Sequence, residues 1–285
     1  MIGAAHPLAF SLHPGAWLGI LALCALYANA IRRPRYAVQP AQAWCFIGAA
    51  AALVVALTWP LADLAAHHLL LALVVQRLVL LLAVPPLLIG ALPTSLVAAI
   101  TRPAAVDAVT RTLSRPVPAV VVVTIVAVGT LSVPAVDLQA ASSIARGAFD
   151  ALLLGAGLVL WMPVLRPVPG TERMSALGSA AYLVVQSILP GFLSFVWIFA
   201  RHPLYGAYAG QRQLWGISSL LDQQLSGFAA KLATIAVLWT VAFVIVSRSE
   251  RGEPDGEDTG SLTWADVERQ LQRVARKEHR RSQLD

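Results

Sequence analysis

Residues 67–90 read HHLLLALVVQRLVLLLAVPPLLIG, and this stretch decides the fold. Arg77 is its only Lys, Arg, Asp or Glu. A helix that crosses a bilayer core of about 30 Å needs about 20 mostly apolar residues. The stretch therefore predicts a membrane-spanning helix. Pro85 and Pro86 near its end predict a kink, because proline removes a helical hydrogen bond.

Further apolar runs of similar length lie on both sides of this stretch. They cover residues 15–31, 42–60, 117–134, 147–165, 176–200 and 226–246. The composition is 58% hydrophobic and 13% charged with a mean hydropathy of +0.70, whereas about 25% of the residues of a soluble domain are charged. We therefore predict an all-α, polytopic membrane protein with seven transmembrane helices. Pro190-Gly191 inside the sixth run predicts a broken helix.

The basic residues are distributed unevenly between the two sides of the membrane. Through Val246 the chain has thirteen Lys or Arg against six Asp or Glu, and the remaining tail has eight against nine. Ten arginines fall in one alternating set of loops or directly after the last run, and three fall in the other set. The positive-inside rule predicts an N-terminus outside and a cytoplasmic C-terminus. This pattern is a topology signal, so it gives no support to nucleic-acid binding.

The chain is expected to have three parts. Residues 1–246 form the seven-helix membrane domain. Residues 247–260 are rich in glycine and acidic residues and predict a flexible linker. Residues 261–285 have apolar residues near one helical face, which predicts a short cytoplasmic amphipathic helix; a loosely ordered solubilising tail is the alternative.

Three ionisable residues, Arg77, Asp150 and Lys231, fall inside predicted spans. Charged side chains in a bilayer are costly and usually face the bundle interior or a cavity. An ion pair between Asp150 and either Arg77 or Lys231 would reduce this cost. Snorkelling of the long side chains to the interface is the alternative. Gln76 adds hydrogen-bonding capacity between helices.

Histidines concentrate at the predicted outer surface, where His67, His68 and His202 are the candidate metal ligands. Neutral imidazole suits copper and zinc. However, His67 and His68 are adjacent, and successive residues of a helix point about 100° apart. A set of histidines in outer loops that binds no metal is the alternative.

The strongest local polar cluster is YGAYAGQRQLWGISSLLDQQLSG, residues 205–227. Tyr205, Tyr208 and Trp215 predict an interfacial aromatic belt, and Asp222 is expected to cap the last helix at its positive end. The chain has no Gly-rich phosphate loop, no GxSxG and no HExxH. These patterns give no support to an enzyme.

Several of these pieces resemble the CtaG-like cytochrome c oxidase assembly factors, which are seven-helix bacterial membrane proteins associated with copper insertion into haem-copper oxidases. The resemblance covers about residues 15–246. It is carried by Trp59-Pro60-Leu61, by VPPLLIGALP (84–93) with Pro85 and Pro86, by GLVLWMPVL (157–165), by Tyr205 and Tyr208, and by WGISSLLDQQLSG (215–227) with Trp215, Asp222, Gln223, Gln224 and Gly227.

The chain departs from this family where the family carries two histidine motifs. The family's HxxQH corresponds here to residues 73–77, so Leu73 and Arg77 replace the histidines and Gln76 remains. The family's HxxxH corresponds to residues 146–150, where Arg146 and Asp150 stand. The arginine side chain has only N–H donors and no acceptor atom that could bind a metal ion. We expect an ion pair between Arg77 and Asp150, with Arg146 nearby, to occupy the space of the family's metal site.

The resemblance implies a membrane assembly factor or scaffold for a respiratory haem-copper oxidase in the bacterial cytoplasmic membrane. An oxidase subunit and the lipid bilayer are the partners that it implies. Copper is the cofactor or cargo that it implies, although the family's histidines are replaced. A transporter of small molecules or ions is the alternative, motivated by the charged residues in spans and by Pro190-Gly191.

Overall fold

The computed structural model describes residues 11–33, 36, 38–168, 170–171, 174–209 and 214–251. Within these ranges the chain is helical and contains no strand. Six helical stretches in them are long and apolar enough to cross a membrane, and a bent helix pair raises the number to as many as seven. The all-helical class is therefore confirmed, with six to seven candidate membrane spans.

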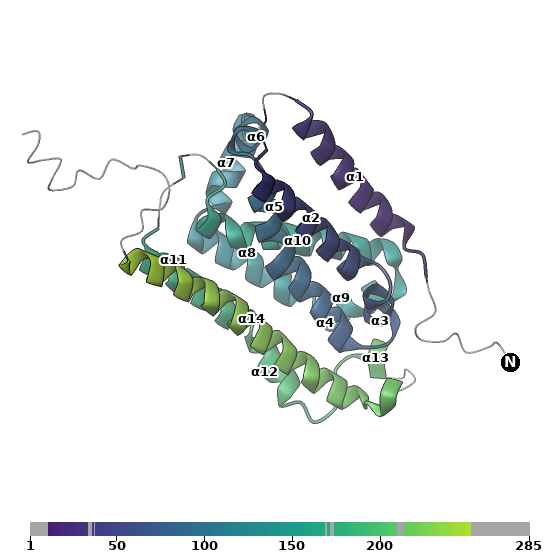
Figure 1. The fold of residues 1–285 in the computed structure, drawn as a ribbon. Helices are drawn as coiled ribbons and strands as arrows, with labels where there is room; N and C mark the ends of the chain where they lie inside the picture. The colour runs from purple at the N-terminus through teal and green to yellow at the C-terminus, as the bar shows by residue number, and fades with distance from the viewer. Residues whose placement is uncertain are drawn as a thin grey trace, which may run out of the picture. The chain divides into compact units, whose positions relative to one another are not determined.

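The spans are single helices or helices joined across a short break (Figure 1). The single ones are α1 (Pro14–Ile31), α10 (Ser143–Leu165) and α14 (Ser219–Glu250). The joined ones are α2 (Pro40–Leu57) with α3 (Leu61–His67), α4 (Leu70–Leu78) with the π-helical turn η1 (Val79–Ala83) and α5 (Val84–Ala91), and α11 (Ala176–Ile188) with α12 (Phe192–Ile198).

The predicted fourth span is shorter than expected. Helix α8 covers Pro116–Gly129, and α7 (Ala104–Leu113) precedes it at an angle of 84°. The chain then turns at Leu131 and Ser132 and forms α9 (Val133–Ala141), a helix that the hydropathy pattern did not predict. The apolar run continued to Pro134 because α9 begins with apolar residues, so hydropathy alone did not show the boundary.

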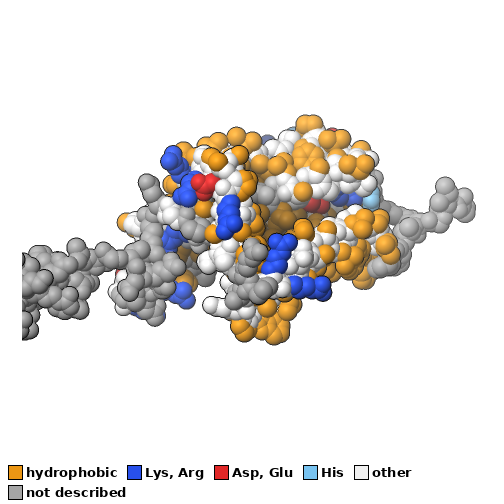
Figure 2. Space-filling view, turned by 90° about the horizontal axis from the view of Figure 1, so that it is seen from above, with side chains coloured by type: hydrophobic (Ala, Val, Ile, Leu, Met, Phe, Trp, Pro, Cys, Tyr) orange, Lys and Arg blue, Asp and Glu red, His pale blue; other side chains and the backbone are white. Residues whose placement is uncertain are grey.

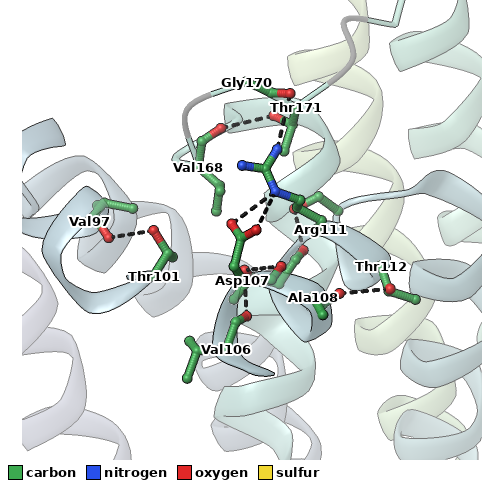
Figure 3. Close-up of polar contacts among 12 residues, drawn as sticks. Val97, Thr101, Val106, Asp107, Ala108, Arg111, Thr112, Val168, Gly170 and Thr171 are labelled. Carbon is green, nitrogen blue, oxygen red and sulfur yellow. Dashed lines mark hydrogen bonds and ion pairs between the residues drawn. The ribbon is translucent and has the colours of Figure 1, made fainter. Parts of the chain in front are cut away.

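Helix α7 carries an ion pair that ties it to a loop distant in sequence. Arg111 Nε donates to both carboxylate oxygens of Asp107, at 2.9 and 2.8 Å. Arg111 Nη1 donates to the carbonyl of Gly170 at 3.3 Å (Figure 3). The first contact is an i,i+4 pair on one helical face, and the second joins α7 to the loop that follows α10.

The prolines near the end of the third span create a contact with α10. Pro85 and Pro86 stand four and five residues after Leu81, and neither has an N–H for the Leu81 carbonyl. Trp161 Nε1 donates to this carbonyl at 3.3 Å. A Cβ at Gly157, one turn earlier on α10, would lie 2.4 Å from Pro85 Cγ and 2.9 Å from the Leu81 carbonyl oxygen. Two of the sequence pieces that carry the resemblance therefore pack on each other.

The break predicted at Pro190-Gly191 is confirmed. Helix α11 ends at Ile188, and α12 begins at Phe192. A Cβ at Gly191 would lie 2.6 Å from the Ser187 carbonyl oxygen and 3.0 Å from Lys231 Nζ. Glycine at this position therefore allows α14 to approach the break.

Helix α1 lies at the edge of the bundle (Figure 1). Near its C-terminal end, the Tyr27 hydroxyl donates to the Ala91 carbonyl at 3.2 Å, and its ring stacks on Phe46. At the other end, His13, directly before the helix, lies 3.3 Å from a carboxylate oxygen of Asp63. Between these two contacts, α1 lines a cavity together with α2 and α10.

The chain divides into two units, residues 1–246 and 247–285. Residues 247–250 of the predicted linker are helical and continue α14. Residues 252–260 of the linker and the predicted amphipathic helix at 261–285 lie outside the described residues. Both remain predictions, as does the orientation of the two termini.

Candidate functional site

Three residues from the two stretches that correspond to the family's histidine motifs line one cavity. Gln76 of α4 and Arg146 and Asp150 of α10 face a space of about 870 Å³ between α1, α2, α3, α4 and α10. In the space-filling view, acidic, basic and histidine side chains gather at one end of a hollow between apolar surfaces (Figure 2). The structure therefore brings together two segments that are about 70 residues apart in the sequence.

Gln76 and Asp150 are neighbours in this cavity. Gln76 Nε2 lies 3.5 Å from Asp150 Oδ2, at the long limit of a hydrogen bond. Gln76 is only 1% exposed, and its Oε1 atom has no hydrogen-bond partner among the described residues. A buried amide oxygen without a donor is costly, so this atom is a candidate acceptor for a bound group.

The expected ion pair between Arg77 and Asp150 is wrong. Arg77 is buried, and it donates to Thr130 Oγ1 at 3.1 Å, to the Thr130 carbonyl at 2.9 Å and to Gln139 Oε1 at 2.7 Å. Thr130 is the C-cap of α8, where unpaired carbonyls and the helix dipole favour a cation. Arg77 therefore joins the third span to α8 and α9 instead of joining it to α10.

Arg146 also points to a helix end. Its Nε and Nη2 atoms donate to the Gln139 carbonyl of α9 at 3.2 and 2.9 Å. Within the described residues, neither Arg77 nor Arg146 lies within 4.0 Å of the Asp150 carboxylate as an ion pair. Asp150 is thus a carboxylate at the cavity without a cation in direct contact.

The donor set does not fit a copper ion. The cavity end offers one carboxylate, one amide, a guanidinium and a single imidazole, that of His13, which lies 3.3 Å from Asp63. The strong copper ligands are imidazoles and thiolates, and one imidazole does not make a copper site. Leu73 is apolar and packs in a different cluster with Trp197, Tyr205 and Tyr208. The residues at the family's histidine positions therefore give no support to a metal centre here.

The three histidines predicted as ligands are not brought together. His67 and His202 are exposed, and His68 is half-buried beside His67 with ring centroids 6.4 Å apart. Across the described part of the chain, no group of three or more His, Cys, Asp or Glu residues is arranged to hold a metal ion. Sequence reasoning missed the contact of His13 with Asp63, because 50 residues separate the two and no local pattern links them.

The second polar region surrounds Asp222. This residue is 4% exposed, and its carboxylate accepts hydrogen bonds from the N–H groups of Leu70 and Leu71 at 2.7 and 3.1 Å. The expectation that Asp222 caps its own helix is wrong, because α14 already begins at Ser219. Asp222 instead supplies the missing cap of α4, whose N-terminal N–H groups have no other helical acceptor.

The residues after Asp222 attach α14 to the loop and helix before it. Gln223 Oε1 accepts from the Leu204 N–H at 2.7 Å, and Gln224 Nε2 donates to the Ala200 carbonyl at 3.3 Å. A Cβ at Gly227 would lie 2.7 Å from the Ser194 carbonyl oxygen. These motif residues therefore have packing and capping roles.

The aromatic-belt prediction is wrong for Tyr205 and Tyr208. Both are buried, and their hydroxyls donate to the carbonyls of Leu131 and Ala65. Burial raises the pKa of the Tyr208 phenol to about 12 and raises the pKa of Tyr205. Trp215 is exposed, as a belt residue would be. The alternation of small and aromatic residues did not show that these hydroxyls anchor their segment to α3 and to the turn after α8.

Lys231 does not pair with Asp150. Its Nζ atom lies 5.0 Å from the centroid of the Phe195 ring, in cation–π range. No ion pair of Lys231 occurs among the residues whose positions are described. Its place beside Gly191 connects α14 to the break between α11 and α12.

Comparison with known proteins gives one finding. The family model of the cytochrome c oxidase caa3 assembly factor matches residues 25–251. Searches of the curated proteins and of the solved structures gave no match.

Proposed function

This chain belongs to the cytochrome c oxidase caa3 assembly factor family, and from that premise we propose that it is a membrane scaffold for the assembly of a respiratory haem-copper oxidase. It acts through helix contacts and loop surfaces and has no catalytic turnover of its own. Its location is the bacterial cytoplasmic membrane, with the N-terminus outside. An oxidase subunit is its partner.

The observation that carries this proposal is the extent of the family match. It covers residues 25–251, which is nearly the whole helical part of the chain. The match includes the packed pieces around Pro85 and Trp161. Polar motif residues such as Asp222 bond to backbone groups of this same chain. Such residues hold the helices in place, which supports a structural role for the motif over a catalytic one.

A scaffold role is better supported than a role in carrying copper. Leu73, Arg77, Arg146 and Asp150 offer no imidazole, and both arginines are engaged with carbonyls at helix ends. If copper is cargo, His67, His68 and His202 are the remaining histidine candidates. Purified protein with these three residues changed to Ala should then lose stoichiometric copper binding that the unchanged protein shows. Absence of stoichiometric binding to the unchanged protein would end the copper version.

Deletion of the gene tests the scaffold. We expect the membranes to lose assembled oxidase, measured as haem absorbance, copper content and oxygen consumption, and we expect the unchanged gene to restore all three. Expression of the protein with Asp137→Asn serves as a surface control. Unchanged oxidase content in the deletion strain would contradict the proposal.

The alternative is transport of a small molecule or ion, and the cavity beside Asp150 is the observation that favours it. Proteoliposomes would then show uptake that Asp150→Asn abolishes. A deletion strain with normal oxidase, together with such uptake, would replace the scaffold with the transporter.

A further inference from the structure

The cavity beside Asp150 changes in polarity along its length. At one end it is lined by His13, Ser143, Arg146 and Asp150. Beyond Asp150 the lining is aliphatic, and it comprises Ile20, Leu23, Leu53, Leu57, Leu80 and Leu154. Since α10 rises about 1.5 Å per residue, the step from Asp150 to Leu154 is about 6 Å. The lining therefore suits a molecule with a polar head and an apolar body that lies along α10.

The polar end requires a donor on the bound molecule. Gln76 Oε1 is buried and has no donor among the described residues, and the Asp150 carboxylate has only the long contact to Gln76 Nε2. Gln76 Oε1 and the Asp150 carboxylate oxygens are hydrogen-bond acceptors. An organic group that binds between them must therefore carry N–H or O–H donors. Arg77 and Arg146 act on the Asp150 carboxylate only from beyond ion-pair distance. A cationic head is therefore the group that can form a direct charged hydrogen bond with it.

The arginine at this end does not call for an anionic head. Arg146 Nε and Nη2 are engaged with the Gln139 carbonyl, which directs its donors toward α9. His13 Nε2 lies 3.3 Å from one carboxylate oxygen of Asp63, and Ser11 Oγ donates to the other, so the Asp63 carboxylate already has partners. Asp150 is therefore the acidic group at the cavity that remains without a direct partner of opposite charge.

We propose that this cavity binds one aliphatic amine, with the ammonium group between Gln76 Oε1 and the Asp150 carboxylate and the chain along Leu80 and Leu154. The volume of about 870 Å³ falls within the range of small-molecule sites, about 300 to 1,000 Å³. The aliphatic lining gives the chain of the amine apolar contacts along α1, α2 and α10. The proposal concerns a ligand of this chain and does not depend on the scaffold role.

Three probes of equal chain length test the head group: dodecylamine, dodecanol and dodecanoate. Native mass spectrometry of the full chain in one detergent counts bound probe at each concentration. We expect one dodecylamine per chain, bound about tenfold or more tightly than dodecanol, since a charged hydrogen bond contributes about 1.5–3 kcal/mol. Equal binding of the three probes would overturn the proposal. Tightest binding of dodecanoate would also overturn it and would assign the head to Arg146.

Variants locate the site. Asp150→Asn and Gln76→Leu should each weaken dodecylamine binding about tenfold or more through the head. Leu154→Trp should weaken it by filling the aliphatic end while the charges stay unchanged. Asp137→Asn, which removes an exposed carboxylate away from the cavity, is the matched control and should bind as the unchanged protein does.

Partition of the probes into micelles is common to all variants, so it cancels in the comparison. If Asp150→Asn and Leu154→Trp both keep full binding while their circular dichroism spectra match the unchanged protein, the amine binds elsewhere and the proposal is wrong. If Asp150→Asn fails to fold, Leu154→Trp and Gln76→Leu still decide the outcome. A failure to bind the amine would not contradict the scaffold proposal, so the two proposals are tested separately.

Discussion

Asp222, in the first turn of α14, accepts a hydrogen bond of 2.7 Å from the backbone N–H of Leu70, the first residue of α4. The other carboxylate oxygen accepts from Leu71 at 3.1 Å. One side chain therefore caps a helix that begins 152 residues earlier in the chain. This bond fixes the start of the third span against the start of the last one.

Removal of this cap should destabilise the protein. Asp222→Ala leaves two N–H groups of α4 without an acceptor, which costs about 1–3 kcal/mol for a buried group. Asp222→Asn keeps one acceptor oxygen and should cost less. Thermal unfolding of the purified protein, followed by circular dichroism, measures the change. Asp137→Ala, at an exposed site of α9, should unfold as the unchanged protein does; an equal loss in both variants would contradict the capping role.

The close approach of α10 to Pro85 gives a second prediction. Gly157→Ala places a Cβ where Pro85 Cγ and the Leu81 carbonyl oxygen lie 2.4 and 2.9 Å away. The helices must separate, at a cost of about 1–3 kcal/mol. Gly155→Ala on the same helix has no atom within 4 Å of its new Cβ, so it is the matched control and should be neutral or stabilising. Equal melting temperatures of the two variants would show that this contact is loose.

The environment of Arg77 predicts that lysine cannot replace arginine there. A single ammonium cannot reach the Thr130 hydroxyl, the Thr130 carbonyl and Gln139 Oε1 with the planar fork of a guanidinium. Arg77→Lys should destabilise the protein by about 2 kcal/mol because buried acceptors lose their donors. Gln139→Leu should then cost less in the Arg77→Lys protein than in the unchanged protein. Chemical unfolding of the unchanged protein, the two single variants and the double variant tests this. If the losses in unfolding free energy of the single variants simply add up in the double variant, Arg77 and Gln139 are not in energetic contact.

Tyr208 predicts a loss of stability at alkaline pH. Burial raises the pKa of its phenol from 10.0 to about 12, so the folded state favours the neutral form. The stabilisation is fully present below pH 10 and is lost as the pH rises through about 12. Tyr208→Phe lacks the ionisable group and should lose less stability over this window, although it starts lower because the hydrogen bond to Ala65 is absent. If the melting temperatures of the two proteins fall by the same amount from pH 9 to 12, the assignment to Tyr208 is wrong.

Local patterns were sufficient for the six long apolar spans and for the break at Pro190-Gly191. An apolar run of about 20 residues predicts a crossing because a helix must satisfy its backbone groups within the bilayer. Pro190 predicted the break between α11 and α12, since proline lacks an N–H wherever it stands. Pro85 and Pro86 predicted a kink, and they lie in the first turn of α5, directly after the π-helical turn. The same reasoning missed α7 and α9, because amphipathic and mixed helices outside the spans carry no long apolar run.

The sequence by itself determined that this chain crosses a membrane as helices and that the polar residues of its spans need partners, because both follow from the cost of unpaired polar groups in lipid. Tertiary structure decided which partners they take. Arg77 turned to the end of α8 and Asp222 to the start of α4, while Asp150 was left facing a cavity. These pairings join residues 53 to 152 positions apart, and their geometry depends on how helices pack, which no local spacing contains.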